Sequence, residues 1–302
     1  MNWISTALLS TMLGTGVSII DSHLLSRRML GLRPFMLAMG IIQLFYILVL
    51  YILFPWPTSL PVNAVLSVIG ASIAGTSSAL ITMFVLQSEE VSRVVPIIHI
   101  SPIFVAIIAT VFLGEDLGYL QWLAIVIVVA GALIITAEKR GTPASTSLKR
   151  PFSLLFVASL LSALASIFTK YTLSYISFWN MYSMALLGTA ITMLGFSLRP
   201  ATVREWIDME RRNSTIIMVF LNEIAALSAS VIFVRAVSLG PVSLVSTITG
   251  TRPAFVAVFS MILKMVLPGF LLELPGKRVM ALRFIAIALI VGGLSIISLT
   301  GE

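Results

Sequence analysis

Stretches of about 20 apolar residues, the length a helix needs to cross a hydrocarbon core of about 30 Å, recur along the whole chain. Short polar segments separate them. Of the 302 residues, 59% are apolar and only 10% are charged, and the mean hydropathy is +1.08. This composition lies outside the range of soluble domains and indicates a protein that crosses a membrane many times.

Apolar windows bounded by helix breakers predict ten transmembrane helices, five on each side of a polar linker with the sequence AEKRGTPASTSLKR. The predicted ranges are Trp3–Leu25, Phe35–Phe54, Val62–Leu86, Val94–Leu113, Tyr119–Thr136, Pro151–Tyr175, Phe178–Leu198, Ser214–Leu239, Val242–Leu267 and Val279–Leu299.

The two halves of the chain resemble each other. Sliding the second half back by 151 positions aligns Pro253 with Pro102, and sliding it by 162 aligns Gly293 with Gly131. A five-helix unit begins and ends on opposite sides of a membrane, so two in tandem lie inverted relative to each other. We therefore predict an all-α integral membrane protein in which two inverted five-helix repeats surround a central cavity. The predicted division is 1–140 for the first repeat, 141–150 for a cytoplasmic linker and 151–302 for the second repeat.

The basic residues predict an orientation. Of the 19 Lys and Arg, all but five fall in segments on one predicted side, whereas opposite loops such as FPWPTSLP contain none. By the positive-inside rule the basic side is cytoplasmic, which places both termini outside the cell (inner) membrane. This distribution explains the net charge of +7. We therefore expect the basic residues to contact the bilayer surface and not nucleic acid.

Each half carries a recognisable pattern. The segment SPIFVAIIATVFLGE followed by WLAIVIVVAGALII resembles the EamA-type transporters of the drug/metabolite transporter superfamily. The resemblance implies a ten-helix carrier or exporter of small metabolites with its cavity between the halves. The second half departs from the pattern, having GFLLELPGKR in place of a Gly-Glu pair. Many members of that family keep both termini in the cytoplasm, against the orientation that the charges predict. The implied cavity-lining ranges are Thr76–Leu86, Val94–Thr110, Asn222–Arg235 and Ser243–Phe259.

Arg252 is the cation deepest within a predicted span. A charge near the bilayer centre costs about 2.5 to 3.5 kcal/mol on insertion scales, so it normally faces a cavity or a partner. Pro253 cannot donate a helical hydrogen bond, which frees carbonyl groups in the preceding turn. Two interpretations stay open: a structural bridge from Arg252 to Glu223, or direct contact of Arg252 with substrate.

Two other ionisable residues lie within predicted spans. Burial of Glu223 favours a neutral acid that carries a proton, whereas a neighbouring guanidinium favours a fixed counter-ion, which we expect. His99 lies two positions before Ser101, the repeat counterpart of Arg252; its imidazole lines the cavity or packs as a neutral group, and proton coupling is a further alternative. The predicted substrate-binding residues are Arg252, Glu223, Asn222, His99, Thr249, Thr251 and Ser101.

A second predicted group lies near the outer face. Lys170 and Arg235 either snorkel to the interface or give an outer mouth a positive potential. Trp179 belongs to an interfacial aromatic belt or, with Asn180, closes an outer gate. The predicted gate or vestibule residues are Lys170, Trp179, Asn180 and Arg235.

The residue content separates the classes of function. The two histidines have no acidic residue at a catalytic spacing, and the chain has neither cysteine nor a glycine-rich phosphate loop. We therefore predict no enzyme, no catalytic residue, no cofactor and no metal. Inverted repeats favour a carrier over a channel.

The excess of buried cations favours a small polar substrate with an anionic or zwitterionic group, such as an amino acid or organic acid. Export of amphipathic drugs or other metabolites is the alternative, and a lipid-precursor flippase a distant one. A proton or counter-substrate as coupling partner, and a monomer or a homodimer, remain open.

Overall fold

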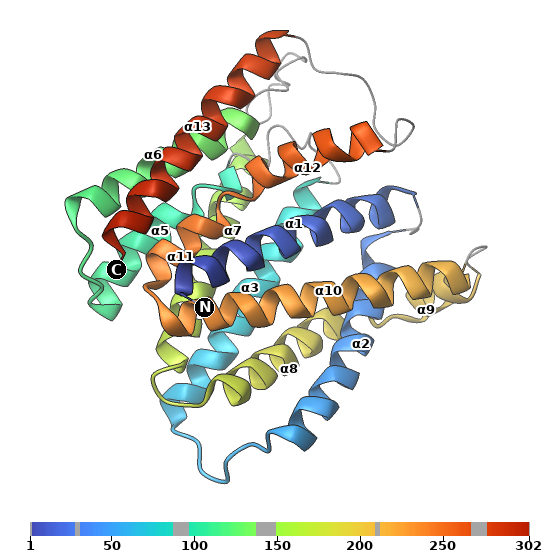
Figure 1. The fold of residues 1–302 in the computed structure, drawn as a ribbon. Helices are drawn as coiled ribbons and strands as arrows, with labels where there is room; N and C mark the ends of the chain where they lie inside the picture. Colours follow the sequence, from blue (N-terminus) through green and yellow to red (C-terminus); the bar gives the residue numbers. More distant parts are fainter. Residues whose placement is uncertain are drawn as a thin grey trace.

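The structure is a computed structural model that describes residues 2–27, 31–86, 97–136, 149–208, 212–266 and 277–301. Helices are the only regular elements in these ranges, and they pack side by side in one bundle (Figure 1). Their bounds are α1 Trp3–Arg27, α2 Leu32–Leu53, α3 Val62–Leu86, α5 Ser101–Ile108, the π-helix η1 Ala109–Leu113, α6 Tyr119–Thr136, α7 Lys149–Thr172, α8 Phe178–Ser197, α9 Pro200–Ile207, α10 Arg212–Leu239, α11 Val242–Thr249, α12 Arg252–Val266 and α13 Lys277–Thr300.

Seven helical segments in the described part of the chain are long and apolar enough to cross a membrane, or eight if the pair α8 and α9, bent by 90°, is one span. Two shorter apolar segments, Ser101–Leu113 and Tyr119–Ile135, accompany them. Many large apolar side chains face outward, among them Phe112, which is 76% exposed, and Leu299, which is 83% exposed. Outward-facing apolar groups at this density suit lipid, and the prediction of an all-helical, multi-pass membrane protein is confirmed.

Two of the predicted spans are broken by turns at equivalent positions. The first has a turn at residues 99–100 before α5 begins, and the second has a turn at residues 250–251 before α12 begins. The breaks are 151 positions apart, the offset of the sequence repeat. Proline occupies the second position of each new helix, at Pro102 and Pro253, where its missing N–H costs no helical hydrogen bond. A Cβ added at Gly250 would lie 3.0 Å from Cγ of Pro102, so the two breaks lie against each other.

The glycines of the second repeat match form a reciprocal contact between α6 and α13. A Cβ at Gly131 would lie 2.9 Å from the carbonyl oxygen of Ala286, and a Cβ at Gly293 would lie 3.1 Å from that of Ala124. Ala286 follows Ala124 by 162 positions, the same offset that separates the two glycines. Each glycine therefore allows the backbone of the other helix to approach closely, and the two contacts are equivalent under the repeat.

Most close packing joins one helix from each predicted half. The contacting pairs include α1 with α10, α3 with α7, α2 with α8, α6 with α13 and α5 with α11. The ends of the chain also meet, because Nε1 of Trp3 donates to the carbonyl oxygen of Gly301 at 3.3 Å. Figure 1 shows the N and C marks at the same side of the bundle.

The Gly-Glu pair at the end of η1 is a structural cap. Gly114 adopts a left-handed backbone conformation, with φ of 67°, that reverses the chain after η1. Glu115 then accepts hydrogen bonds from the backbone N–H of Val242 at 2.5 Å and that of Ser243 at 3.2 Å. Its carboxylate thus covers the N-terminus of α11, where the helix dipole is positive.

Candidate functional site

A polar cavity of about 300 Å³ lies where the two broken helices meet α7 and α10. Its wall combines both helix breaks with one face of α7, so residues distant in the sequence share one space. The lining residues are Ile98, His99, Ser101 and Pro102 at the first break, Ser162, Ala165, Ser166 and Thr169 of α7, Phe233 of α10, and Ser246, Thr249, Gly250 and Arg252 at the second break.

The helix breaks place two helix N-termini at this cavity. α5 begins at Ser101 and α12 begins at Arg252, and both residues line the wall. The first N–H groups of a helix have no partner within the helix and carry about half a positive charge between them. At these two breaks the N–H of Ile103 bonds Ile100 O at 3.0 Å and that of Ala254 bonds Thr251 O at 2.9 Å. Arg252 is the one cation among the lining residues of the cavity.

The guanidinium of Arg252 reaches the backbone of α1. A Cβ added at Gly14 would lie 2.8 Å from Nη2 and 3.3 Å from Nε, so a side chain there would displace the guanidinium from this position. Nε of Arg252 is buried and has no hydrogen-bond partner, and the same is true of Oγ of Ser246. A buried donor without an acceptor costs about 1 to 3 kcal/mol. Both atoms are therefore unsatisfied within the described part of the chain.

Asp21 is the carboxylate whose charge attracts Arg252. Oδ1 of Asp21 accepts a hydrogen bond from Nδ2 of Asn222 at 2.6 Å, which joins α1 to α10. Glu223 lies on the same helix as Asn222, but its Oε1 accepts from Nε2 of Gln43 at 2.9 Å. The bridge between Arg252 and Glu223 that one interpretation expected is not formed between these two described side chains.

The structure brings four of the seven predicted substrate-binding residues together. His99, Ser101, Thr249 and Arg252 all line the cavity. The other three lie outside its wall and are closely packed. Asn222 is 3% exposed, Glu223 is 1% exposed, and Thr251 is fully buried with its hydroxyl donating to Ile248 O at 2.6 Å.

Sequence reasoning missed the hydroxyl groups of α7. Ser162, Ser166 and Thr169 are spaced by four and three residues, which places them on one face of a helix. Thr169 donates to Ala165 O at 2.8 Å, and such bonding within a helix makes serine and threonine common in membrane spans. The spacing was the available signal, and the apolar character of the span concealed it.

None of the four predicted gate residues lines the cavity. Lys170 donates to the carbonyl oxygens of Val237 and Gly240, both at 2.8 Å, and so caps the C-terminus of α10. Arg235 is exposed. Trp179 stacks on Phe54 with ring centroids 4.7 Å apart. The backbone N–H of Asn180 bonds the Ser177 hydroxyl that caps α8, at 3.4 Å.

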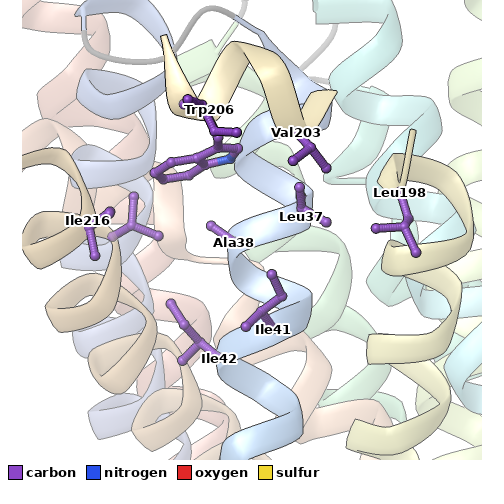
Figure 2. Close-up of a pocket in the computed structure, with 10 residues that line it drawn as sticks. Leu37, Ala38, Ile41, Ile42, Leu198, Val203, Trp206 and Ile216 are labelled. Atoms are coloured by element: carbon purple, nitrogen blue, oxygen red, sulfur yellow. The ribbon is translucent and has the colours of Figure 1, made fainter. Parts of the chain in front are cut away.

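A second hollow is an apolar groove of about 380 Å³ that shares no lining residue with the polar cavity. In Figure 2 the indole of Trp206, on the short helix α9, lies over α2 beside Ala38 and Leu37. Nε1 of Trp206 donates to the carbonyl oxygen of Pro34 at 2.7 Å, which holds α9 against α2. The lining residues are Leu37, Ala38, Ile41, Ile42, Leu198, Val203, Trp206, Ile207, Ile216 and Val219.

Comparison with known proteins supports the resemblance drawn from the sequence. The EamA-like transporter family matches residues 2–137. A protein of a Sinorhizobium species, described as an uncharacterized transporter in the cobO 3′ region, is 32% identical over 79 residues. That segment is 26% of this chain and 56% of the relative, so the chain spans little more than half of the relative's length.

The fold is shared over a much longer stretch. A crystal structure of another protein superposes with a TM-score of 0.75 over 99% of this chain and 98% of its own, at 14% sequence identity. At that identity the likeness is one of fold. The resemblance to EamA-type transporters is confirmed by the family match over residues 2–137, and the fold of the chain is shared with a solved structure.

Proposed function

We propose that this chain, whose residues 2–137 match the EamA-like transporter family, is a secondary transporter that works by alternating access. Its substrate is a small polar metabolite with an anionic or zwitterionic group, such as an amino acid or organic acid. The observation that carries the proposal is Arg252, whose Nε lacks an acceptor while its side chain lines a polar cavity at a helix break.

An anionic group fits the donors of this cavity. The guanidinium of Arg252 offers a planar set of N–H groups that matches a carboxylate or phosphate. The N-termini of α5 and α12 add partial positive charge from the backbone. Broken helices that direct their N-termini at an anionic group are the usual binding device of carriers built from repeats.

A zwitterion also fits because the second break combines two kinds of helix end. The C-terminus of α11, at Thr249, faces the same break as the N-terminus of α12. Helix C-termini carry partial negative charge, which suits an ammonium group a few ångströms from the carboxylate. The hydroxyl groups of Ser162 and Ser166 add neutral donors and acceptors on the facing wall.

We further propose that the fold is a ten-helix pair of inverted repeats. The packing pattern supports this, because exchanging the halves converts the pair α1 and α10 into the pair α7 and α3, which also occurs. The matching helix breaks and the reciprocal glycine contact support the same symmetry. Alternating access then follows from rocking of the two repeats about the cavity.

Counterflow in proteoliposomes tests the substrate class. Purified protein would be reconstituted with one unlabelled compound inside and the labelled compound outside, using glutamate, succinate, alanine, choline and tetraphenylphosphonium. We expect accumulation of glutamate, succinate or alanine, and none of the two cations. Accumulation restricted to choline or tetraphenylphosphonium would overturn the proposed substrate class.

Substitution of Arg252 tests the site. We expect Arg252→Gln to weaken binding of the transported acid by about 10- to 150-fold, because a hydrogen bond to a charged group contributes about 1.5 to 3 kcal/mol. Arg252→Lys keeps the charge but loses the planar fork, so its loss should be intermediate. Arg204→Gln, an equal charge change at an exposed position of α9, is the control and should bind like the unmodified protein. Lower folded yield of Arg252→Gln with unchanged affinity would indicate a structural role.

The apolar groove favours a second candidate, export of amphipathic compounds. Its walls are aliphatic apart from the ring of Trp206, and they would accept an apolar tail. A lipid-precursor flippase is a more distant form of the same idea. Accumulation of tetraphenylphosphonium that Trp206→Ala abolishes and Arg252→Gln leaves intact would favour this candidate.

A further inference from the structure

A buried polar layer separate from the cavity joins α1, α2 and α10. It contains Asp21 of α1, Gln43 of α2, and the neighbours Asn222 and Glu223 of α10. Gln43 is 4% exposed, Asn222 3% and Glu223 1%. Each of these three side chains keeps one oxygen without a hydrogen-bond partner: Oε1 of Gln43, Oδ1 of Asn222 and Oε2 of Glu223. This buried layer therefore has three acceptor oxygens without a hydrogen-bond donor, and an added proton would supply a donor.

Glu223 lies among neutral and acidic groups. Tyr46 of α2 and Tyr182 of α8 lie within electrostatic reach of its carboxylate, and the hydroxyl of Tyr182 donates to Leu227 O at 3.1 Å. On α1 the group that faces Glu223 is Asp21, and the negative charge of its carboxylate repels that of Glu223. None of these is a cation, and the described side chains provide no ion pair to Glu223.

Two cations on other helices, Lys170 and Arg252, have other partners. Lys170 of α7 caps the far end of α10 at Val237 and Gly240. Arg252 of α12 is attracted to Asp21. A buried carboxylate without a cation is costly, and proteins relieve that cost by binding a proton.

We propose that Glu223 is a proton-binding site that couples proton uptake to the binding of an anionic group at Arg252. The proton comes from water on one side of the membrane, binds a carboxylate oxygen of Glu223, and returns to water on the other side when the carrier has changed its access. This inference rests on the proposed function for its role in transport, while proton binding itself stands on the buried layer.

Gln43 can serve both forms of Glu223. When the carboxylate is charged, the side-chain amide of Gln43 donates to Oε1, as in the structure. When Glu223 holds a proton, rotation of the amide presents Oε1 of Gln43, which has no partner, as the acceptor for the new O–H group. One side chain therefore provides a hydrogen bond to either protonation state.

The connection to the cavity is electrostatic. Asp21 accepts from Asn222, the neighbour of Glu223, and attracts Arg252, so the layer and the cavity share one set of charges. With Asp21 and Glu223 charged and Arg252 cationic, the formal sum is one negative charge, and a bound anion makes it two. A proton on Glu223 restores the sum to one. Anion binding therefore favours proton binding, and by linkage a proton strengthens anion binding, typically by about 5- to 150-fold.

Infrared difference spectroscopy of the ligand-free protein in lipid nanodiscs tests the proton site without any substrate. We expect a carbonyl band of a protonated carboxylic acid to appear as the pH is lowered. Glu223→Gln should remove that band, because glutamine imitates the neutral form and should fold. Glu205→Gln, the same change on α9, is the matched control and should retain it. A band that survives Glu223→Gln and disappears in Asp21→Asn would overturn the proposal.

Two further measurements guard against ambiguous outcomes. If Glu223→Gln does not fold, Gln43→Leu is the second variant; it should shift the midpoint of the band, and an unmoved midpoint would overturn the proposal. Exchanging choline chloride for sodium chloride should leave the band unchanged. A band that sodium displaces at constant pH would identify a metal-cation site instead.

Transport tests the coupling separately. In counterflow with the glutamate, succinate and alanine panel, affinity of the unmodified protein should rise about tenfold or more as the pH falls. Glu223→Gln should keep the high affinity at every pH, and Glu205→Gln should keep the pH dependence. If no panel compound is carried, the proposed function fails while the infrared result still decides the proton site. If transport occurs with the same pH dependence in Glu223→Gln, the coupling is overturned.

Discussion

At the scale of single residues, Arg252 breaks the symmetry of the repeats. Its counterpart in the first half is Ser101, and both residues begin a helix after a turn and line the same cavity. The backbone geometry therefore belongs to the repeat, whereas the cation belongs to one half. Gly14 makes the asymmetry sterically feasible, because a side chain there would occupy the space of the guanidinium.

Substitutions of two threonines beside Arg252 can distinguish an effect on substrate affinity from an effect on stability. Both hydroxyls donate to a backbone carbonyl, that of Thr249 to Ser246 O at 3.0 Å and that of Thr251 to Ile248 O at 2.6 Å, but only Thr249 lines the cavity, whereas Thr251 is fully buried. We expect Thr251→Val to lower the free energy of unfolding by about 0.5 to 1.5 kcal/mol and leave affinity unchanged. Thr249→Val should lower affinity for the transported acid and lower the midpoint of thermal unfolding less than Thr251→Val does, because its hydroxyl is only partly buried. The reverse assignment of the two effects would contradict the placement of these hydroxyls.

At the scale of elements, the breaks and the glycines determine how closely helices approach. The turn at residues 250–251 replaces regular helical bonding with shorter-range bonds, because the N–H of Thr251 bonds Ile248 O at 3.1 Å and that of Ala254 bonds Thr251 O at 2.9 Å. Proline after each break keeps the new helix from extending backward. The glycines on α6 and α13 remove side chains from a crossing where the backbones meet, as small residues do between membrane helices.

Neighbouring glycines of α13 provide a matched test of that crossing. A Cβ at Gly293 would lie 2.6 Å from Cγ2 of Val128, whereas one at Gly292 would meet nothing within 4 Å. We expect Gly293→Ala to reduce the free energy of unfolding by about 1 to 3 kcal/mol through overpacking. Gly292→Ala should leave stability unchanged or slightly raised, because alanine favours helix over glycine. Thermal unfolding in detergent measures both, and equal midpoints would mean that α6 and α13 do not approach this closely.

At the scale of the whole molecule, the halves are interleaved and do not form two separate bodies. The packing of α1 on α10, α2 on α8 and α3 on α7 gives each half contacts with the other along its length. Trp3 and Gly301 join the two ends of the chain. Motion between repeats must therefore preserve these pairings or slide along them, which favours rocking over separation of the halves.

The orientation of the whole molecule in the membrane follows from its basic residues. The positive-inside rule places residues 141–150 in the cytoplasm and the segment that contains Ser59 outside. Because the chain has no cysteine, single substitutions Gly141→Cys and Ser59→Cys can each be labelled with a membrane-impermeant maleimide. We expect labelling of Ser59→Cys in intact cells and of Gly141→Cys only after lysis. The opposite pattern would reverse the orientation.

The sequence by itself determined the membrane class, the positions of most spans, the internal repeat and the two prolines that mark the broken helices. These properties are local, because hydropathy and the missing proline N–H act wherever a residue lies in the chain. The ends of helices were less accurate, since the turns before Ser101 and Arg252 interrupt apolar stretches that read as continuous.

Only the tertiary structure decided which polar groups meet. Glu223 and Arg252 are the obvious partners in a list of membrane charges, yet Glu223 contacts Gln43 and Arg252 is attracted to Asp21. Neighbouring positions on one helix, such as Asn222 and Glu223, point about 100° apart, and which neighbour each one meets depends on the rotation and pairing of every helix around it. That arrangement results from packing of the whole bundle, and no single segment of the sequence contains it.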